Sequence, residues 1–198
     1  SLYTTKLKKP IFITDKAALN KMGRKNSFAS INLTDLSIMV SLIDVKKLGL
    51  EKYPIEILAH EIGHHIYTPG DLGDQGRLLA RINRGLMDLK KYSPLVANLY
   101  TDLLVNEKLF RLNELKLDEV YKKLKDEADN NLWNFYMRIY EILWALEKGT
   151  LTSANLSSEI EGDSQLANRL IKSYRDEWLK GASRFASLCY PYLVENEN

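Results

Sequence analysis

The chain has 198 residues, a length that suits one sizeable hydrophobic core or one core with a helical extension. Its formal net charge of +2 argues against the strongly basic surface that nucleic acids and acidic membranes attract, and 45% apolar with 27% charged residues is ordinary for a soluble globular protein. A single cysteine excludes an intramolecular disulfide and no apolar stretch is long enough to cross a membrane, so we expect a cytoplasmic protein.

In chain order, the N-terminal part of the sequence predicts a small β-sheet. Runs rich in β-branched residues alternate with turn residues, which is typical of short strands. The expected elements are a strand at 8–14, a helix at 15–24 capped by Asp15, and a strand pair within 28–43 whose turn lies near Thr34 and Asp35. Residues 44–48 fit equally well the end of that strand pair or a short helix.

From Pro54 onward the apolar residues follow the period of a helix. Proline suits a first helical position, because the N–H that it lacks would be unpaired there anyway. Apolar residues then recur with helical spacing until Ile66, and Thr68-Pro69-Gly70 ends the helix. A glycine-rich loop, GDLGDQG, follows at 70–76. The rest of the chain predicts helices near 75–91, 94–112, 117–128, 131–148 and 163–188, with their aromatic residues in the core.

All three histidines of the chain lie on the predicted helix that begins at Pro54, in the segment AHEIGHHIY. His60, Glu61 and His64 form the pattern H-E-x-x-H. Residues four apart share one face of a helix, so both imidazoles can bind one metal ion, typically zinc. Glu61 lies one position on, where its carboxylate can take a proton from zinc-bound water and pass it to a leaving amine. Gly63 is expected to leave room beside the ligands.

The third metal ligand is expected to be a carboxylate. The chain has no fourth histidine, and His65 points about 100° away from His64 around the helix. Cys189 is a possible soft ligand, but a lone cysteine in a helix is more often a small core residue. His65 and Tyr67 remain weaker candidates for contacts to the ligands or the substrate. The Tyr67 hydroxyl could assist an oxyanion, or its ring could simply pack at the helix end.

A polar stripe downstream contains the best candidate carboxylate. Asn98, Asp102 and Asn106 recur every fourth residue in an otherwise apolar helix. Buried polar groups need partners, so we predict Asp102 as the third ligand, with the two asparagines orienting ligands or substrate. Glu107 is the alternative ligand. It lies about 140° around the helix from Asp102, so only one of the two can serve, and otherwise Glu107 is expected to be an exposed surface charge.

Residues 28–112 resemble gluzincin-like metallopeptidase domains of prokaryotes, which belong to the HExxH zincins. The likeness is carried by ASINLTDLSIMVSLIDVKKLGLEKYPIEILAHEIGHHIYTPGD and by NLYTDLLVNEKL. Such domains occur linked, in one chain or operon, with von Willebrand factor A modules and MoxR-type AAA+ ATPases. The resemblance implies zinc held by His60, His64 and Asp102, with Glu61 as the base. It also implies that an edge strand near 28–43 holds an extended peptide by strand addition.

Together these observations predict an α+β, zincin-like fold. A small N-terminal sheet would pack on the metal-binding helix, with a metallopeptidase core at 1–115 and a helical extension at 116–198. The leading functional hypothesis is a zinc metallopeptidase, a hydrolase with a protein or peptide substrate. The second is a catalytically silent, metal-stabilised interaction module in an assembly with a von Willebrand factor A module and a MoxR-type ATPase. We expect neither nucleic acid nor membrane as a partner.

Overall fold

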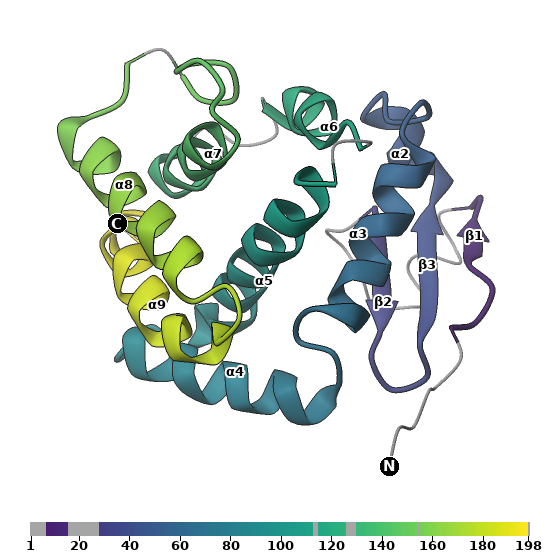
Figure 1. Ribbon diagram of the computed structural model, residues 1–198, viewed down its shortest axis with the longest axis horizontal. Helices are drawn as coiled ribbons and strands as arrows, with labels where there is room; N and C mark the ends of the chain where they lie inside the picture. The colour runs from purple at the N-terminus through teal and green to yellow at the C-terminus, as the bar shows by residue number, and fades with distance from the viewer. Residues whose placement is uncertain (1–6, 16–27, 113–114, 126–129, 154, 198) are drawn as a thin grey trace.

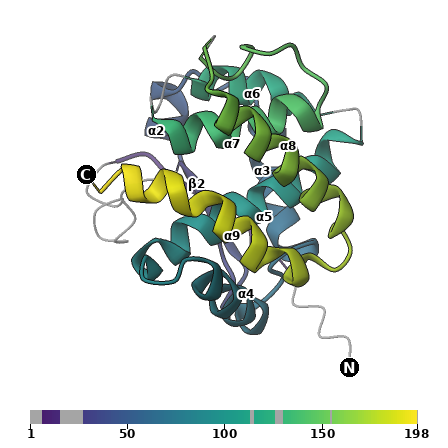
Figure 2. The ribbon, with the colours of Figure 1, turned by 90° about the vertical axis from the view of Figure 1, so that its left-hand side faces the viewer.

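The computed structural model describes residues 7–15, 28–112, 115–125, 130–153 and 155–197. A small sheet lies at one end of the molecule, and helices form the rest (Figure 1). Figure 2 shows α8 (Ser158–Ser173) and α9 (Trp178–Glu195) on the side opposite the sheet. The expected α+β class, with a small N-terminal sheet and a mostly helical remainder, is confirmed. Within the described ranges, no helix is long and apolar enough to cross a membrane.

The sheet contains three described strands in the order β1-β3-β2. β1 (Ile11–Ile13) runs parallel to β3 (Ser37–Ser41), and β2 (Ala29–Asn32) runs antiparallel to β3. The predicted strand pair and the turn between its strands are therefore confirmed. The helix predicted at 15–24 falls almost wholly outside the described residues.

Two helices connect the sheet to the rest of the molecule. α2 (Leu42–Lys47) confirms the short-helix alternative, and the Ser41 hydroxyl caps it by accepting a hydrogen bond from the Asp44 N–H. α3 (Pro54–Ile66) begins with its proline, as predicted, and lies across the sheet (Figure 1). The sheet and these helices share a small core, to which α6 (Leu117–Leu124) adds one side chain: Ala29, Ile38, Val40, Val45, Leu50, Ile57 and Val120.

The glycine-rich segment at 70–76 is mostly helical, so the predicted loop is wrong there. α4 (Leu72–Gly85) starts inside it and ends before residue 91. The Asp71 carboxylate accepts a hydrogen bond of 2.8 Å from the Asp74 N–H and so caps the helix. This cap and a buried apolar face offset the low helix propensity of the two glycines in the first turns.

α5 (Ser93–Phe110) is the central helix. A short 3₁₀ turn leads into it, and it packs on α3 on one side and on α4, α7 and α9 elsewhere (Figure 1). α6 (Leu117–Leu124) and α7 (Asn131–Leu143) begin where the sequence predicted and end earlier. The continuous helix predicted at 163–188 is wrong, since α8 and α9 are separate helices. One helix of that length would extend about 39 Å, whereas two helices can both pack on the same core.

α3 and α5 approach each other closely at Gly63. A Cβ atom on Gly63 would lie 2.5 Å from Val105 Cγ1 on α5, which is closer than two non-bonded carbon atoms approach each other in proteins. Val105 is fully buried, and its branched side chain has little freedom to move away. Gly63 therefore makes room for α5, and not for a ligand beside the histidines as the sequence had suggested.

Replacing Gly63 by alanine should separate α3 from α5. We expect Gly63→Ala to lower the free energy of unfolding by about 1–3 kcal/mol, the usual cost of overpacking a core. Gly76→Ala is the matched control, because that helical glycine has nothing within 4 Å of the added Cβ. It should raise stability by about 0.5–1 kcal/mol through helix propensity alone. Urea unfolding measures the stability of both variants. An equal gain in the free energy of unfolding for the two variants would contradict the close contact between α3 and α5.

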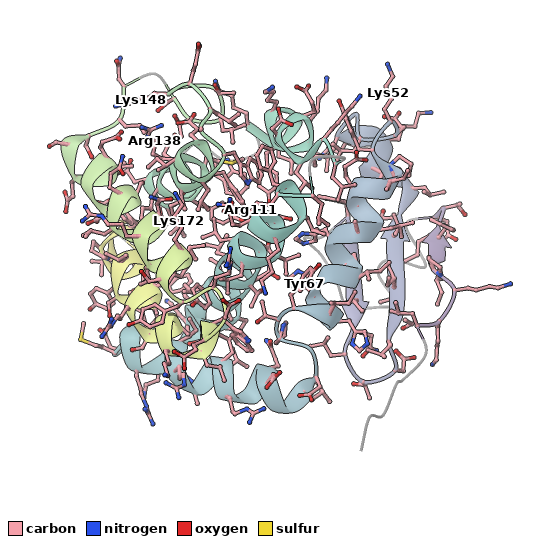
Figure 3. The ribbon with its side chains drawn as sticks, in the orientation of Figure 1. Lys52, Tyr67, Arg111, Arg138, Lys148 and Lys172 are labelled. Carbon is pink, nitrogen blue, oxygen red and sulfur yellow. The ribbon has the colours of Figure 1, made fainter. Side chains whose placement is uncertain are left out.

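Arg138 joins α7 to α8 through a partly buried ion network. Its guanidinium donates to both Glu161 oxygens at 3.0 and 2.8 Å and to Glu141 Oε2 at 2.9 Å. Lys148 also pairs with Glu161, and Figure 3 shows Arg138 and Lys148 in the same corner of the molecule. The hydrogen bonds from Arg138 hold the pKa of Glu161 down at about 2 in spite of partial burial.

Acid should weaken the fold through Glu161. A carboxyl group with a depressed folded-state pKa stabilises the fold above its ordinary pKa of 4.5, and this contribution disappears as the pH falls toward about 2. We expect Glu161→Gln to cost about 1–2 kcal/mol in urea unfolding at neutral pH and much less near pH 2. Glu177→Gln, which breaks only an exposed pair with Lys180, should cost less than about 0.5 kcal/mol. A pH-independent loss for Glu161→Gln would contradict this assignment.

Candidate metal centre

Three side chains from two helices converge beside the sheet. His60 and His64 lie four residues apart on α3, and Asp102 lies in the middle of α5. His64 Nε2 is 3.1 Å from His60 Nε2 and 3.1 Å from Asp102 Oδ1, and His60 Nε2 is 3.6 Å from Asp102 Oδ1. The structure thus brings together the three residues that the sequence predicted as metal ligands.

These separations match the edges of a tetrahedron around a metal ion. Zinc binds imidazole nitrogen and carboxylate oxygen at about 2.0–2.2 Å, so tetrahedral angles put neighbouring ligand atoms about 3.3–3.6 Å apart. The separations of 3.1, 3.1 and 3.6 Å lie within about 0.2 Å of that range. Three protein ligands also leave a fourth position for water or substrate, as in catalytic zinc sites. A divalent cation therefore fits between these donor atoms.

Hydrogen bonds decide which nitrogen of each imidazole faces the cluster. His60 Nδ1 lies 2.8 Å from Asn106 Oδ1, and His64 Nδ1 lies 3.1 Å from the Thr68 carbonyl oxygen. Both partners are acceptors, so each Nδ1 carries the proton and each Nε2 presents a lone pair to the centre. Asn106 occupies the orienting position that the sequence predicted. The Thr68 contact was not predicted, because a backbone carbonyl leaves no trace in the pattern of residue types.

The two carboxylate oxygens of Asp102 have different environments. Oδ2 accepts a hydrogen bond of 2.9 Å from Asn98 Nδ2, which gives Asn98 the orienting contact expected of it. Oδ1 faces the imidazoles, 3.1 Å from His64 Nε2, and has a hydrogen-bond partner there only when that nitrogen carries a proton. A buried, unpaired oxygen opposite two nitrogen lone pairs is unfavourable. Either a cation or an extra proton on His64 would relieve it.

Electrostatics within the cluster favour positive charge at its centre. Burial lowers the pKa of His64, but the hydrogen bond and charge of Asp102 more than offset it, so that the pKa is raised. Burial raises the pKa of Glu61, while His60 and His64 act in the opposite direction. A bound divalent cation supplies that positive charge and favours the deprotonated forms of all these groups.

Glu61 lies between the cluster and the sheet. Its side chain is 5% exposed, and it lines the same cleft as the three candidate ligands. The carboxylate accepts a hydrogen bond from the Ile31 backbone on β2, which favours the charged form. A buried carboxylate beside the candidate metal site is placed to exchange protons with a molecule bound in the cleft.

The cleft beside the metal cluster has a volume of about 840 Å³, within the usual range of ligand-binding sites. β2 and α3 form one wall and α5 forms the other, and α6 and α7 close one end. Among the described residues, the lining holds two histidines and three acids and no lysine or arginine: His60, His64, Glu56, Glu61 and Asp102. The cleft is large enough for a bound peptide in extended form to lie across the candidate ligands.

Glu107, the alternative ligand, lies outside the cluster. Its Oε1 accepts a hydrogen bond of 2.7 Å from Arg111 Nε, and Figure 3 shows Arg111 on α5 at a distance from the sheet. Glu107 is also not the exposed charge that was expected, since it is 3% exposed. Burial raises the pKa of Glu107, although Arg111 lowers it. The structure therefore favours Asp102 over Glu107 as the third ligand.

Three weaker candidates also lie away from the cluster. The His65 Nδ1 faces the Gly70 carbonyl oxygen at 3.2 Å, so this imidazole holds the turn after α3. Tyr67, labelled in Figure 3 at the end of α3, packs against α5, and the Lys108 ammonium lies 4.9 Å from its ring centre. Cys189 is fully buried in α9, and burial raises the pKa of its thiol. None of the three lines the cleft.

The sequence did not identify the groups behind Asn106. Tyr121 on α6 and Tyr140 on α7 accept hydrogen bonds from its amide, and Tyr121 and Tyr136 line the cleft. The aromatic residues of α7 were expected only as core, where Phe135, Tyr136 and Tyr140 are buried and Trp133 is partly buried. Their hydroxyl groups meet near the candidate metal site because α6 and α7 fold back onto α5, which no local pattern reveals.

Comparisons with models of protein families, with curated proteins and with solved structures found no match to this chain. The likeness of residues 28–112 to gluzincin-like domains therefore rests on the motifs alone.

Removing the Asp102 carboxylate should abolish metal binding. We expect Asp102→Ala to weaken zinc affinity by more than about 100-fold, beyond the roughly 10–100-fold that loss of an outer hydrogen-bond partner causes. Glu107→Gln should bind zinc as the wild type does, because Glu107 faces Arg111. Chelator competition followed by elemental analysis measures both variants. Loss of zinc from Glu107→Gln with retention in Asp102→Ala would reverse the assignment.

Proposed function

We propose that this protein is a zinc-dependent metallopeptidase. The observation that carries the proposal is the set of three donor atoms, from buried or partly buried side chains, at 3.1 to 3.6 Å from one another, with the Glu61 carboxylate beside them in the cleft. A structural zinc site usually has four protein ligands, whereas a catalytic site has three and an accessible fourth position. The three donors and the cleft support the catalytic kind.

A zincin-like arrangement is part of the same proposal. Its support is that α3 carries H-E-x-x-H and lies across a small sheet, while an acidic ligand comes from the following long helix α5. Among the described strands, β2 is the edge strand of the sheet on the side that lines the cleft. We therefore propose that a substrate peptide lies in extended form along β2, as in strand addition.

The chemistry divides between the cation and the chain. When bound, zinc lowers the pKa of water and polarises a carbonyl oxygen. Glu61 then acts as general base: its carboxylate takes the proton of the attacking water and delivers it to the nitrogen of the departing amine. The hydrogen bond from the Ile31 backbone would hold this carboxylate in place and favour its charged form, which a general base needs.

The substrate class follows from the walls of the cleft. Among the described residues, the lining carries three carboxylates and no lysine or arginine, so neutral and basic peptides are favoured over acidic ones. Association with a von Willebrand factor A module and a MoxR-type ATPase is a further proposal, and it rests only on the resemblance of residues 28–112.

Glu61→Gln provides the test of the hydrolase. The variant should bind one zinc per chain as the wild type does, since Glu61 is not among the three donors, but hydrolysis should fall by about 10²–10⁴-fold. Cleavage of a quenched fluorescent peptide library measures activity, and elemental analysis measures zinc. His65→Gln is the control, because His65 faces Gly70, and it should retain both properties.

Two outcomes would contradict the proposed hydrolase. Undiminished turnover in Glu61→Gln would exclude Glu61 as the base. Zinc binding by a wild-type protein that cleaves no peptide in the library would instead favour the catalytically silent, metal-stabilised module.

A further inference from the structure

Three tyrosine hydroxyl groups form a closed hydrogen-bonded ring behind the metal cluster. The Tyr140 hydroxyl lies 3.0 Å from that of Tyr121 and 2.9 Å from that of Tyr136, and the hydroxyls of Tyr121 and Tyr136 are 3.4 Å apart. We call these residues the tyrosine triad. All three are at most 8% exposed. Buried hydroxyl groups need hydrogen-bond partners. The other contacts of this ring of hydroxyl groups therefore indicate its role.

Asn106 connects the tyrosine triad to the metal cluster. This residue is fully buried, and its amide nitrogen donates to Tyr121 at 2.7 Å and to Tyr140 at 2.8 Å. Its amide oxygen is 2.8 Å from His60 Nδ1. The path therefore runs from a ligand imidazole through one amide to two hydroxyl groups, and each step is a hydrogen bond of ordinary length.

The orientation of this amide decides whether His60 can bind a cation. With the oxygen toward His60, Nδ1 carries the proton and Nε2 offers a lone pair to the centre. With the amide reversed, its nitrogen would donate to Nδ1, and the imidazole proton would move to Nε2, where it blocks a metal. The first orientation directs two N–H groups at the triad and needs two acceptors. The reversed orientation directs only the amide oxygen at the triad, and one hydroxyl donor is enough to satisfy that oxygen.

We propose that Tyr121 and Tyr140 are positioning residues, which hold the Asn106 amide with its oxygen toward His60 and thereby keep His60 ready for the cation. The inference rests on the proposed metal site and deepens it. It makes α6 and α7 part of the metal centre, although neither helix supplies a ligand. Tyr136 contacts the other two hydroxyls but not Asn106, so its hydroxyl is not needed for this role.

Zinc affinity of single tyrosine variants tests the proposal. We expect Tyr140→Phe and Tyr121→Phe to weaken zinc binding by about tenfold. This is the lower end of the roughly 10–100-fold loss that follows removal of a residue outside the ligand shell that orients a metal ligand. Tyr136→Phe should bind within a small factor of the wild type. Tyr192→Phe controls for loss of a buried hydroxyl elsewhere, since Tyr192 is 2% exposed and bonds to Asp163 at 2.7 Å. Chelator competition measures affinity, and the visible absorption of the cobalt(II) form reports ligand geometry.

A double-mutant cycle shows whether the tyrosines act through Asn106. Asn106→Ala should weaken zinc binding by about 10–100-fold, and adding Tyr140→Phe to it should cause no further loss. The cobalt spectrum should change in Tyr140→Phe and Tyr121→Phe and stay as in the wild type in Tyr136→Phe and Tyr192→Phe. Thermal unfolding of each metal-free variant separates loss of affinity from loss of fold.

Several results would overturn the positioning role of the tyrosines. Each of them can be distinguished from the result expected if the protein has no metal site. Equal affinity losses for Tyr136→Phe and Tyr140→Phe, or additive losses in the cycle, would mean that the triad does not act through Asn106. If Tyr140→Phe and Tyr121→Phe unfold while Tyr192→Phe folds, the triad is structural and the positioning role is excluded. A wild-type protein that binds neither zinc nor cobalt would instead reject the metal centre itself.

Discussion

The contact between α3 and α5 is the constraint on which the rest of the structure depends. α3 carries both imidazoles and Glu61, and α5 carries the carboxylate that meets them. The two helices come close enough only because Gly63 has no side chain where Val105 packs. A separation larger by one methyl group would move Asp102 away from His64, so that Oδ1 would lose the imidazole opposite it while Oδ2 would keep its bond from Asn98. The sheet supports this geometry from the other side, because α3 lies across it.

The candidate centre also explains why α5 carries polar groups inside a hydrophobic core. Asn98 and Asn106 each bind one of the converging side chains, and Asn106 binds two tyrosines as well. Burying amides and a carboxylate costs free energy unless every donor and acceptor is paired. The Asp102 Oδ1 atom points at the gap between the imidazoles, and Thr68 Oγ1 and Glu107 Oε2 are further buried oxygens of this region without a hydrogen-bond partner among the residues described. A cation between the imidazoles would give Asp102 Oδ1 a positively charged partner.

Local patterns in the sequence predicted most elements of the fold, and the errors have a common cause. The strand pair, the helix at Pro54 and the central helix α5 were all expected, because their apolar periodicity is strong. The segment at 70–76 was expected to be a loop from its glycines, but the Asp71 cap and packing of α4 on the core outweigh their low propensity. The division into α8 and α9 was missed because both helices have the same periodicity, and only the size of the core requires the chain to turn between them.

The sequence by itself identified the candidate donors on α3, since a spacing of four residues places His60 and His64 on one helical face wherever that helix lies. It also limited the third ligand to a small set of acids. Tertiary structure alone decided between Asp102 and Glu107, because the choice depends on how α5 is rotated about its axis when it packs against Gly63. It likewise decided the Thr68 and tyrosine contacts, which join residues distant in the chain. Helical periodicity is a local property, whereas the convergence of two helices is set by the packing of the whole core.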